Sequence, residues 1–211
     1  IDDLENLLDH LGLDNNITLV VHDWGGMIGM GYASRHPQRI KRIIALNTSC
    51  FHLPKAKSFP FSLWLIRNTP LGALLVRGLN LFALGASWVG CKRTELSAEL
   101  KKAYVAPYDS WQNRIATLRF VEDIPLKKGD RAYAIVDKVE ASLPHFKDTP
   151  MLLFWGEKDF VFDRAFLEEW QQRFPHAEAH SFPDGGHYIL EDAFDEILPR
   201  IKDFLKASPT S

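Results

Sequence analysis

The sequence predicts an α/β protein, a mostly parallel sheet flanked by helices and interrupted by a helical insertion. A helix-like segment and short apolar runs alternate up to residue 46, which is typical of parallel strands joined by helices. Prolines and aromatic residues then break the pattern, and the alternation resumes near residue 127. We therefore expect three parts: core at 1–49, a helical cap at 50–126 and core again at 127–211.

The first part alternates two helices with two strands. Its opening leucines lie on one helical face, and Gly12 follows them as a stop. Residues 17–21 form a short, almost wholly apolar run, as expected for a strand that is buried on both faces. A helix at 27–35, ended by His36-Pro37, and a second strand at 40–46 complete this part.

The predicted cap consists of short, aromatic-rich helices that prolines separate. We interpret it as an insertion laid over the sheet rather than another sheet layer. For most of its aromatic residues we favour a plain helical subdomain in which they form only a local core, and contact with a substrate is the alternative. The aromatic residues concerned are Trp64, Phe82, Trp88, Tyr104, Tyr108 and Trp111.

The last part returns to alternating helices and strands. We expect helices at 131–143 and 164–174, and strands at 151–155 and 177–182. A closing helix at 191–206 should be kinked or restarted at Pro199, because proline cannot donate a backbone hydrogen bond.

Charge and cysteine content narrow the class of protein. A net charge of −2 over 211 residues provides no basic field, so we expect no nucleic-acid partner. Two cysteines, Cys50 and Cys91, are too few for a disulfide framework, which favours the cytoplasm. The most apolar stretch, residues 71–90, is broken by Arg77, Asn80 and glycines. It suits a cap that faces substrate or touches a membrane surface better than a membrane span.

No cofactor or metal is expected. The sequence contains no glycine-rich phosphate loop, so nucleotide cofactors are not implied. Its one H-x-x-x-H spacing, His176 to His180, falls on a strand-like stretch, where the two residues lie roughly 13 Å apart. That separation is too large for both rings to bind one ion.

The most informative motif is LVVHDWGG at residues 19–26. An apolar strand ends in an acid, an aromatic residue and two glycines, and a helix follows, which is the layout of a nucleophile elbow. The residue at the turn is Asp23, where serine is the commoner nucleophile. A carboxylate is ionised at neutral pH and needs no base to attack carbon. The alternative is that Asp23 only caps the following helix.

Two further polar residues follow predicted strands, Asp159 and His187. The carboxyl ends of parallel strands meet at one edge of a sheet, where open α/β sheets bind their ligands. The order Asp23, Asp159, His187 is that of nucleophile, acid and histidine in a hydrolase triad. His187 would activate water while Asp159 orients its ring. Taken singly, Asp159 could be a turn former and His187 a loop residue.

Three motifs carry a family resemblance: VHDWGG at 21–26, WGEKDFVF at 155–162 and GGHYILED at 185–192. They resemble the haloalkane dehalogenase and epoxide hydrolase branch of the α/β-hydrolase superfamily. Residues 104–121 and FALGASWVG at 82–90 are most similar to the dehalogenase-like β-lactone decarboxylases of bacterial long-chain olefin biosynthesis. That resemblance implies conversion of a hydrophobic cis-3,4-dialkyl β-lactone to a cis-alkene and carbon dioxide. Haloalkane dehalogenase and epoxide hydrolase are the alternative activities.

The resemblance also implies roles for individual residues. Asp23 would be the nucleophile, His187 the base and Asp159 its partner, while Trp24 would stabilise the leaving group or a carboxylate oxygen. Dehalogenases use a second donor, for which Trp64, Trp88 and Trp111 are the cap candidates. Epoxide hydrolases use two cap tyrosines, for which Tyr104 and Tyr108 are candidates.

One departure from the family concerns the start of the chain. In this superfamily several strands and a His-Gly-x-Pro-type loop precede the elbow, and here a single predicted helix precedes it. We expect the strand at 17–21 to be an unpaired edge, covered by a missing N-terminal segment of the same fold or by a second copy. The resemblance further implies a multi-enzyme assembly. An inactive fragment or interaction module is the alternative from another class.

Overall fold

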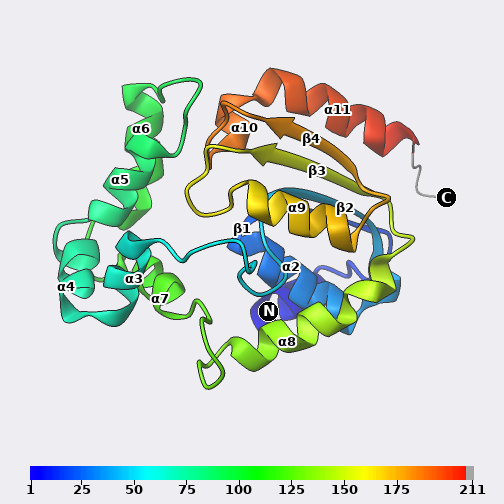
Figure 1. The fold of residues 1–211 in the computed structure, drawn as a ribbon, viewed down its shortest axis with the longest axis horizontal. Coiled ribbons are helices and arrows are strands. Elements are labelled where there is room, and N and C mark those ends of the chain that lie inside the picture. Colours follow the sequence, from blue (N-terminus) through cyan, green and yellow to red (C-terminus); the bar gives the residue numbers. More distant parts are fainter. Residues whose placement is uncertain (208–211) are drawn as a thin grey trace.

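The sheet places the chemically useful residues at one edge. The computed structural model describes residues 1–207 and, within them, one sheet of parallel strands in the order β1-β2-β3-β4 (Figure 1). Because every pair is parallel, the strands' carboxyl ends lie at the same edge. The strands are β1 (Ile17–Asp23), β2 (Ile40–Thr48), β3 (Met151–Gly156) and β4 (Glu178–Phe182).

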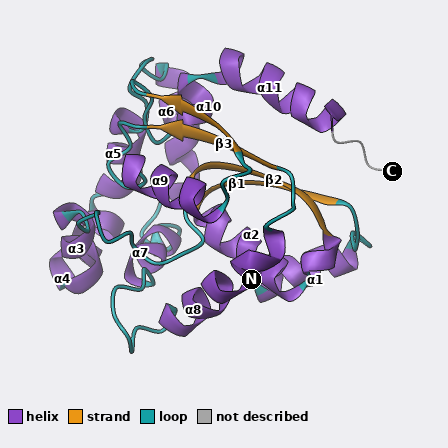
Figure 2. Ribbon diagram, turned by 45° about the vertical axis from the view of Figure 1, so that its right-hand side comes forward, coloured by secondary structure: helices purple, strands orange, loops and turns teal. Residues whose placement is uncertain are grey.

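Helices cover the sheet unequally. Strand residues such as Val21, Ala45 and Leu153 pack on one face against α1 (Asp2–His10), α2 (Trp24–Arg35), α8 (Tyr133–Ser142) and α9 (Arg164–Arg173). Residues such as Leu46 and Phe154 face α10 (Ile189–Asp192) and α11 (Phe194–Ala207) on the other side (Figure 2). β3 is buried along its whole length, which explains its continuous apolar sequence.

A separate group of helices lies beside the carboxyl edge of the sheet (Figure 1). These cap helices are α3 (Phe61–Asn68), α4 (Pro70–Ala73), α5 (Leu81–Val89), α6 (Ala98–Val105) and α7 (Ile115–Glu122). They fall inside the insertion predicted at 50–126, and the three-part division of the chain remains a prediction. Shorter 3-10 or π segments are η1 (Pro37–Arg39), η2 (Leu74–Gly78), η3 (Ala106–Tyr108) and η4 (Leu143–Phe146).

Within residues 1–207, no single helix has both the length and the apolar composition of a membrane span. The segments Pro70–Gly78 and Leu81–Val89 reach that length and composition only as a pair, bent by 72°.

The predicted strands are all present, and each boundary lies within two residues of the expected one. Two helix predictions are wrong in detail. α2 begins at Trp24 rather than at residue 27, because the backbone turns at Asp23 alone (φ 50, ψ −124). The closing helix is broken at Ala193 and does not restart at Pro199, which lies inside α11, while a kink at Pro199 stays a prediction. The break follows the short helix α10, whose Asp192 is held by backbone N–H groups of another segment.

The close packing of α2 on β2 predicts opposite effects for two neighbouring glycines. A Cβ at Gly26 would overlap the Thr48 side chain and lie 2.7 Å from the Ser49 carbonyl oxygen. A Cβ at Gly25 would meet only Val21, at 3.8 Å. We expect Gly26→Ala to lower the free energy of unfolding by about 1–3 kcal/mol through overpacking.

Gly25→Ala is the matched control, and it should change stability by less than about 1 kcal/mol, in the stabilising direction. Urea denaturation monitored by circular dichroism measures both variants. Equal effects of the two substitutions would contradict the packing argument.

Candidate active site

Asp23 occupies a strained turn between β1 and α2. Its φ of 50° lies in the left-handed region that non-glycine residues rarely adopt. The Thr48 hydroxyl, at the end of β2, donates a hydrogen bond to the Asp23 carbonyl oxygen and holds this turn. The carboxyl group therefore lies at the N-terminus of α2, where unpaired N–H groups, including that of Trp24, favour negative charge.

His187 and Asp159 form a hydrogen-bonded pair beside Asp23. The His187 Nδ1 lies 2.7 Å from the Asp159 Oδ2. Burial alone would raise the pKa of Asp159, but the hydrogen bond from His187 and that ring's charge hold it below its ordinary value. Burial would likewise lower the pKa of His187, and the Asp159 carboxylate outweighs it, so that the pKa is raised. The pair thus favours an imidazolium in contact with a carboxylate.

Asn47 is a residue of this site that the sequence did not reveal. It is fully buried and has a φ of 30°. It lies near the end of β2, and its sequence neighbourhood indicated only a strand. Its side-chain N–H₂ group donates to the Gly156 carbonyl (2.9 Å), to the Asp159 Oδ2 (3.1 Å) and to the Phe162 carbonyl (3.1 Å). Its Oδ1 accepts from the Gly156 N–H at 2.7 Å. Asn47 therefore fixes both Asp159 and the loop that carries it.

His22 forms a hydrogen bond with the backbone of the His187 loop. Its Nε2 lies 2.8 Å from the His187 carbonyl oxygen, so the proton of a neutral His22 is on Nε2, and the two rings are 4.7 Å apart. Burial, followed by the nearby charge of His187, lowers the pKa of His22 below its ordinary value. His22 is thus a neutral donor that stabilises the His187 backbone.

Asp192 joins the His187 loop to the cap. Its carboxylate accepts from the Gly186 N–H at 2.7 Å, directly before His187. The same carboxylate accepts from the N–H groups of Lys92 (2.8 Å) and Arg93 (3.0 Å), which follow α5. The Tyr188 N–H also donates to the Gly90 carbonyl oxygen, at 2.9 Å. The position of His187 is therefore coupled to that of α5.

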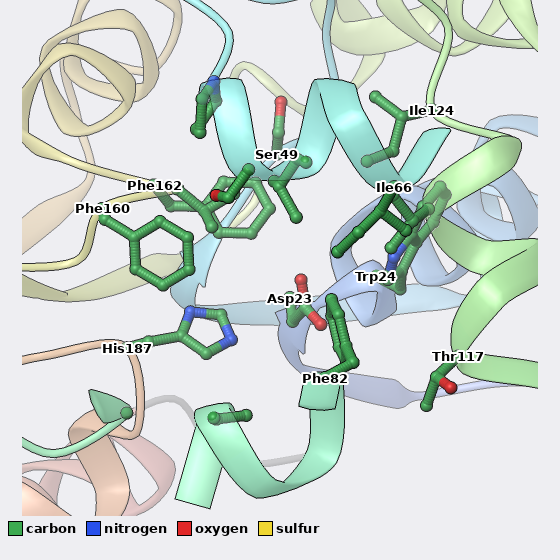
Figure 3. A pocket seen from close by; sticks show the side chains of 18 of the residues that line it. Asp23, Trp24, Ser49, Ile66, Phe82, Thr117, Ile124, Phe160, Phe162 and His187 are labelled. Atoms are coloured by element: carbon green, nitrogen blue, oxygen red, sulfur yellow. The ribbon is translucent and has the colours of Figure 1, made fainter. Parts of the chain in front are cut away.

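The Asp23 carboxyl group and the His187 ring both face a cavity of about 870 Å³ between the sheet edge and the cap helices (Figure 3). Its walls are mainly apolar, and Phe82, Ile66, Ile124, Phe160 and Phe162 are among them. This volume is within the range of small-molecule sites. Trp24 also lines the cavity, and its ring packs against Phe120 with 5.1 Å between centroids.

The candidate cap residues divide into two groups. Trp64, Trp88 and Trp111 do not line the cavity and are 45%, 66% and 45% exposed. Their spacing in short aromatic helices could not show which way they face, and the structure turns them outward. Tyr104 and Tyr108 do line the cavity. The Tyr104 hydroxyl donates to the Glu191 carboxylate at 2.8 Å.

The sheet order, the elbow and the histidine–acid pair define a class of protein. The alpha/beta hydrolase fold family matches residues 1–194, and the chain belongs to this family. The fold also matches the crystal structure of a haloalkane dehalogenase from Agrobacterium tumefaciens C58, with a TM-score of 0.83 at 23% identity, over 98% of this chain and 71% of that one.

Two relatives narrow the similarity within the family. The chain is 59% identical to the cis-3-alkyl-4-alkyloxetan-2-one decarboxylase of Shewanella oneidensis, over 100% of this chain and 66% of that protein. It is 44% identical to the protein of the same name from Xanthomonas campestris pv. campestris, over 99% and 69%. A haloalkane dehalogenase of Mycolicibacterium smegmatis is 27% identical, over 97% and 66%. The resemblance expected from the motifs is confirmed, and the chain spans about two thirds of these relatives' length.

The hydrogen bonds of Asn47 predict a large loss of stability in Asn47→Ala. The substitution leaves the buried Gly156 N–H without an acceptor, which costs about 1–3 kcal/mol. It also removes one donor, worth about 0.5–1.5 kcal/mol, from each of three oxygens that keep a second donor. We expect the free energy of unfolding to fall by on the order of 3 kcal/mol or more, measured by urea denaturation.

Asn113→Ala is the control, since Asn113 is exposed and its amide donates only to the Asp109 side chain. It should change stability by less than about 0.5 kcal/mol. A similar, small loss in both variants would show that Asn47 does not organise the Asp159 loop.

The lowered pKa of His22 predicts a pH dependence of stability. Between its folded and unfolded pKa values the unfolded state binds more protons, so stability rises with pH and falls on acidification below about 6.5. His22→Gln keeps a side-chain N–H donor but cannot titrate. We expect the parent protein to lose more thermal stability than His22→Gln between about pH 7.5 and 5. Parallel curves for the two proteins would exclude His22 as a titrating group.

Proposed function

We propose that the full-length protein decarboxylates cis-3,4-dialkyl β-lactones to cis-alkenes. The observation that carries this proposal is that the Asp23 carboxylate faces a large, mainly apolar cavity. Burial of alkyl chains there contributes roughly 0.8 kcal/mol per methylene. The two relatives with the decarboxylase name are more similar to the chain than the dehalogenase reported above, which supports the lactone as substrate.

In the first step an Asp23 oxygen attacks the alkyl-bearing ring carbon that is bonded to the ring oxygen, not the carbonyl carbon. It approaches from the face opposite that bond, which breaks and leaves its electron pair on a free carboxylate. The product is an alkyl ester of Asp23. The nearby His187 imidazolium, Trp24 and the N-terminus of α2 would stabilise the new carboxylate.

In the second step the bond from carbon to this carboxylate breaks. Its electron pair forms the alkene, the ester carbon–oxygen bond breaks, and carbon dioxide leaves while Asp23 regains its charge. The attack inverts the carbon, so ester oxygen and carboxylate lie on opposite faces, and their anti elimination yields a cis-alkene from a cis-lactone. The two steps consume neither water nor a redox partner.

A haloalkane dehalogenase is the second candidate. It would use the same ester of Asp23, and His187, oriented by Asp159, would activate water to hydrolyse it. The Mycolicibacterium smegmatis similarity favours this candidate. An epoxide hydrolase with two donor tyrosines is less favoured, because the Tyr104 hydroxyl already donates to Glu191.

We further propose that the free edge of β1 pairs with another segment of the same fold or with a second copy. Within residues 1–207, β1 pairs with β2 alone, and Val20 is 57% exposed.

Three further expectations remain proposals: location in the cytoplasm, contact of the cap with a membrane surface, and a multi-enzyme assembly. Support for membrane contact comes from exposed cap residues such as Phe61 (74%) and Trp88 (66%).

The proposed mechanism predicts that Asp23→Ala abolishes alkene formation, by roughly 1,000-fold or more. The assay supplies the full-length protein with a dialkyl β-lactone, a bromoalkane and an alkyl epoxide, and measures alkene, bromide and diol. Asp203→Ala, at an exposed carboxylate on α11, is the control and should retain full activity. Bromide release without attack on the lactone, or unchanged alkene formation in Asp23→Ala, would refute the proposal.

Water labelled with ¹⁸O separates the two ways of breaking the ester. Elimination to the alkene returns Asp23 with its original oxygens, whereas hydrolysis of the ester places a water oxygen on Asp23. Mass spectrometry of the Asp23 peptide after many turnovers should therefore show no label with the lactone. Label on Asp23 after lactone turnover would instead indicate hydrolysis.

A further inference from the structure

We propose that the cavity has two arms that diverge from Asp23, one for each alkyl chain, and that Gly85 on α5 sets how large a chain the first arm accepts. This inference rests on the proposed function and deepens it. It follows from which elements line the cavity on either side of Asp23, and from the space in front of Gly85.

The first arm lies between α5, α6 and the His187 loop. Gly85, Ala86 and Val89 line it from α5, while Tyr104 and Tyr188 line it from the far side. The rings of Tyr104 and Tyr188 stack at 4.8 Å, and Tyr188 is held to α5 through the Gly90 carbonyl. These contacts make a fixed apolar wall on that side of the nucleophile.

The second arm leads away from Asp23 in the other direction, toward α3, α7 and α8. In Figure 3, Phe82 of α5 lies beside and below Asp23, whereas Ile66 and Ile124 lie above it. Beyond them the lining continues through Ala132 and Ile135 at the start of α8. In Figure 1, α3 and α7 lie between α5 and α8, so these two parts of the lining are well separated along the cavity.

Gly85 differs from the other glycines of the cap. A Cβ at Gly72 would overlap the Ile66 backbone, a Cβ at Gly78 would lie 3.0 Å from Leu74, and one at Gly90 would lie 2.5 Å from Tyr188. Packing therefore explains those three. A Cβ at Gly85 would meet nothing within 4 Å, although Gly85 lies inside a helix, where alanine is more favourable than glycine. The missing side chain leaves open volume in the first arm.

Two isomeric lactones test the two arms with one product. One isomer carries a long chain on the carbon next to the carbonyl and a short chain on the carbon bonded to the ring oxygen, and the other isomer has them exchanged. Both give the same cis-alkene, so one chromatographic assay measures both. The reacting atoms must sit at Asp23, so the two isomers place their long chains in opposite arms.

The experiment compares kcat/KM for both isomers in the full-length parent protein, Gly85→Ala and Gly85→Leu. Leucine fills the first arm, and each methylene displaced from it weakens binding about fourfold. We expect Gly85→Leu to lower kcat/KM roughly 100-fold for the isomer whose long chain uses the first arm, and less than about threefold for the other. Gly85→Ala adds one methyl group in open space and should change both values by less than about fourfold.

Ala132→Leu, in the second arm, is the matched variant and should show the opposite preference. Thermal melts establish that each variant is folded. Equal losses for both isomers in Gly85→Leu, in a parent protein that converts both, would overturn the two-arm assignment and leave the proposed function intact. Absence of alkene from either isomer with the parent protein would overturn the proposed function and this inference with it.

Discussion

The site depends on the single-residue turn at Asp23. The turn has a left-handed backbone conformation, and the Thr48 hydroxyl holds it from the neighbouring strand. Directly after the turn, α2 packs so near the end of β2 that residue 26 has no room for a side chain. These contacts present the Asp23 carboxylate at a helix N-terminus, above the sheet edge and below the cap helices. The Asp23 carboxylate is therefore positioned by the core and needs no contribution from the cap.

The histidine side of the site is organised by buried polar side chains. Asn47 donates a hydrogen bond to Asp159, whose carboxylate orients the His187 ring. His22 and Asp192 form hydrogen bonds with the backbone around His187. No buried side-chain nitrogen or oxygen within residues 1–207 lacks a hydrogen-bond partner. Such a network is strong when complete and costly when one member is removed. Because Asp192 also accepts hydrogen bonds from the segment after α5, the His187 loop and the cap are mechanically linked.

Some elements were predictable and others were not, for identifiable reasons. The two central strands were predictable because residues 151–156 and 43–46 are buried on both faces and so read as continuous apolar runs. Asn47 was not, because its partners lie more than 100 residues away and its own segment reads only as a strand. The break at Ala193 was missed for the same reason, since Asp192 is held by residues 92 and 93.

The sequence by itself determined the order of strands and helices, the elbow at Asp23 and the positions of Asp159 and His187. These features depend on local patterns and on the rule that parallel strands end at one edge. Only the tertiary structure decided which cap side chains face the cavity. Helices α3–α7 are short and aromatic on several sides, so periodicity could not tell Trp64, Trp88 and Trp111, which face outward, from Tyr104 and Tyr108, which line the cavity. Their orientation is set by packing between distant segments.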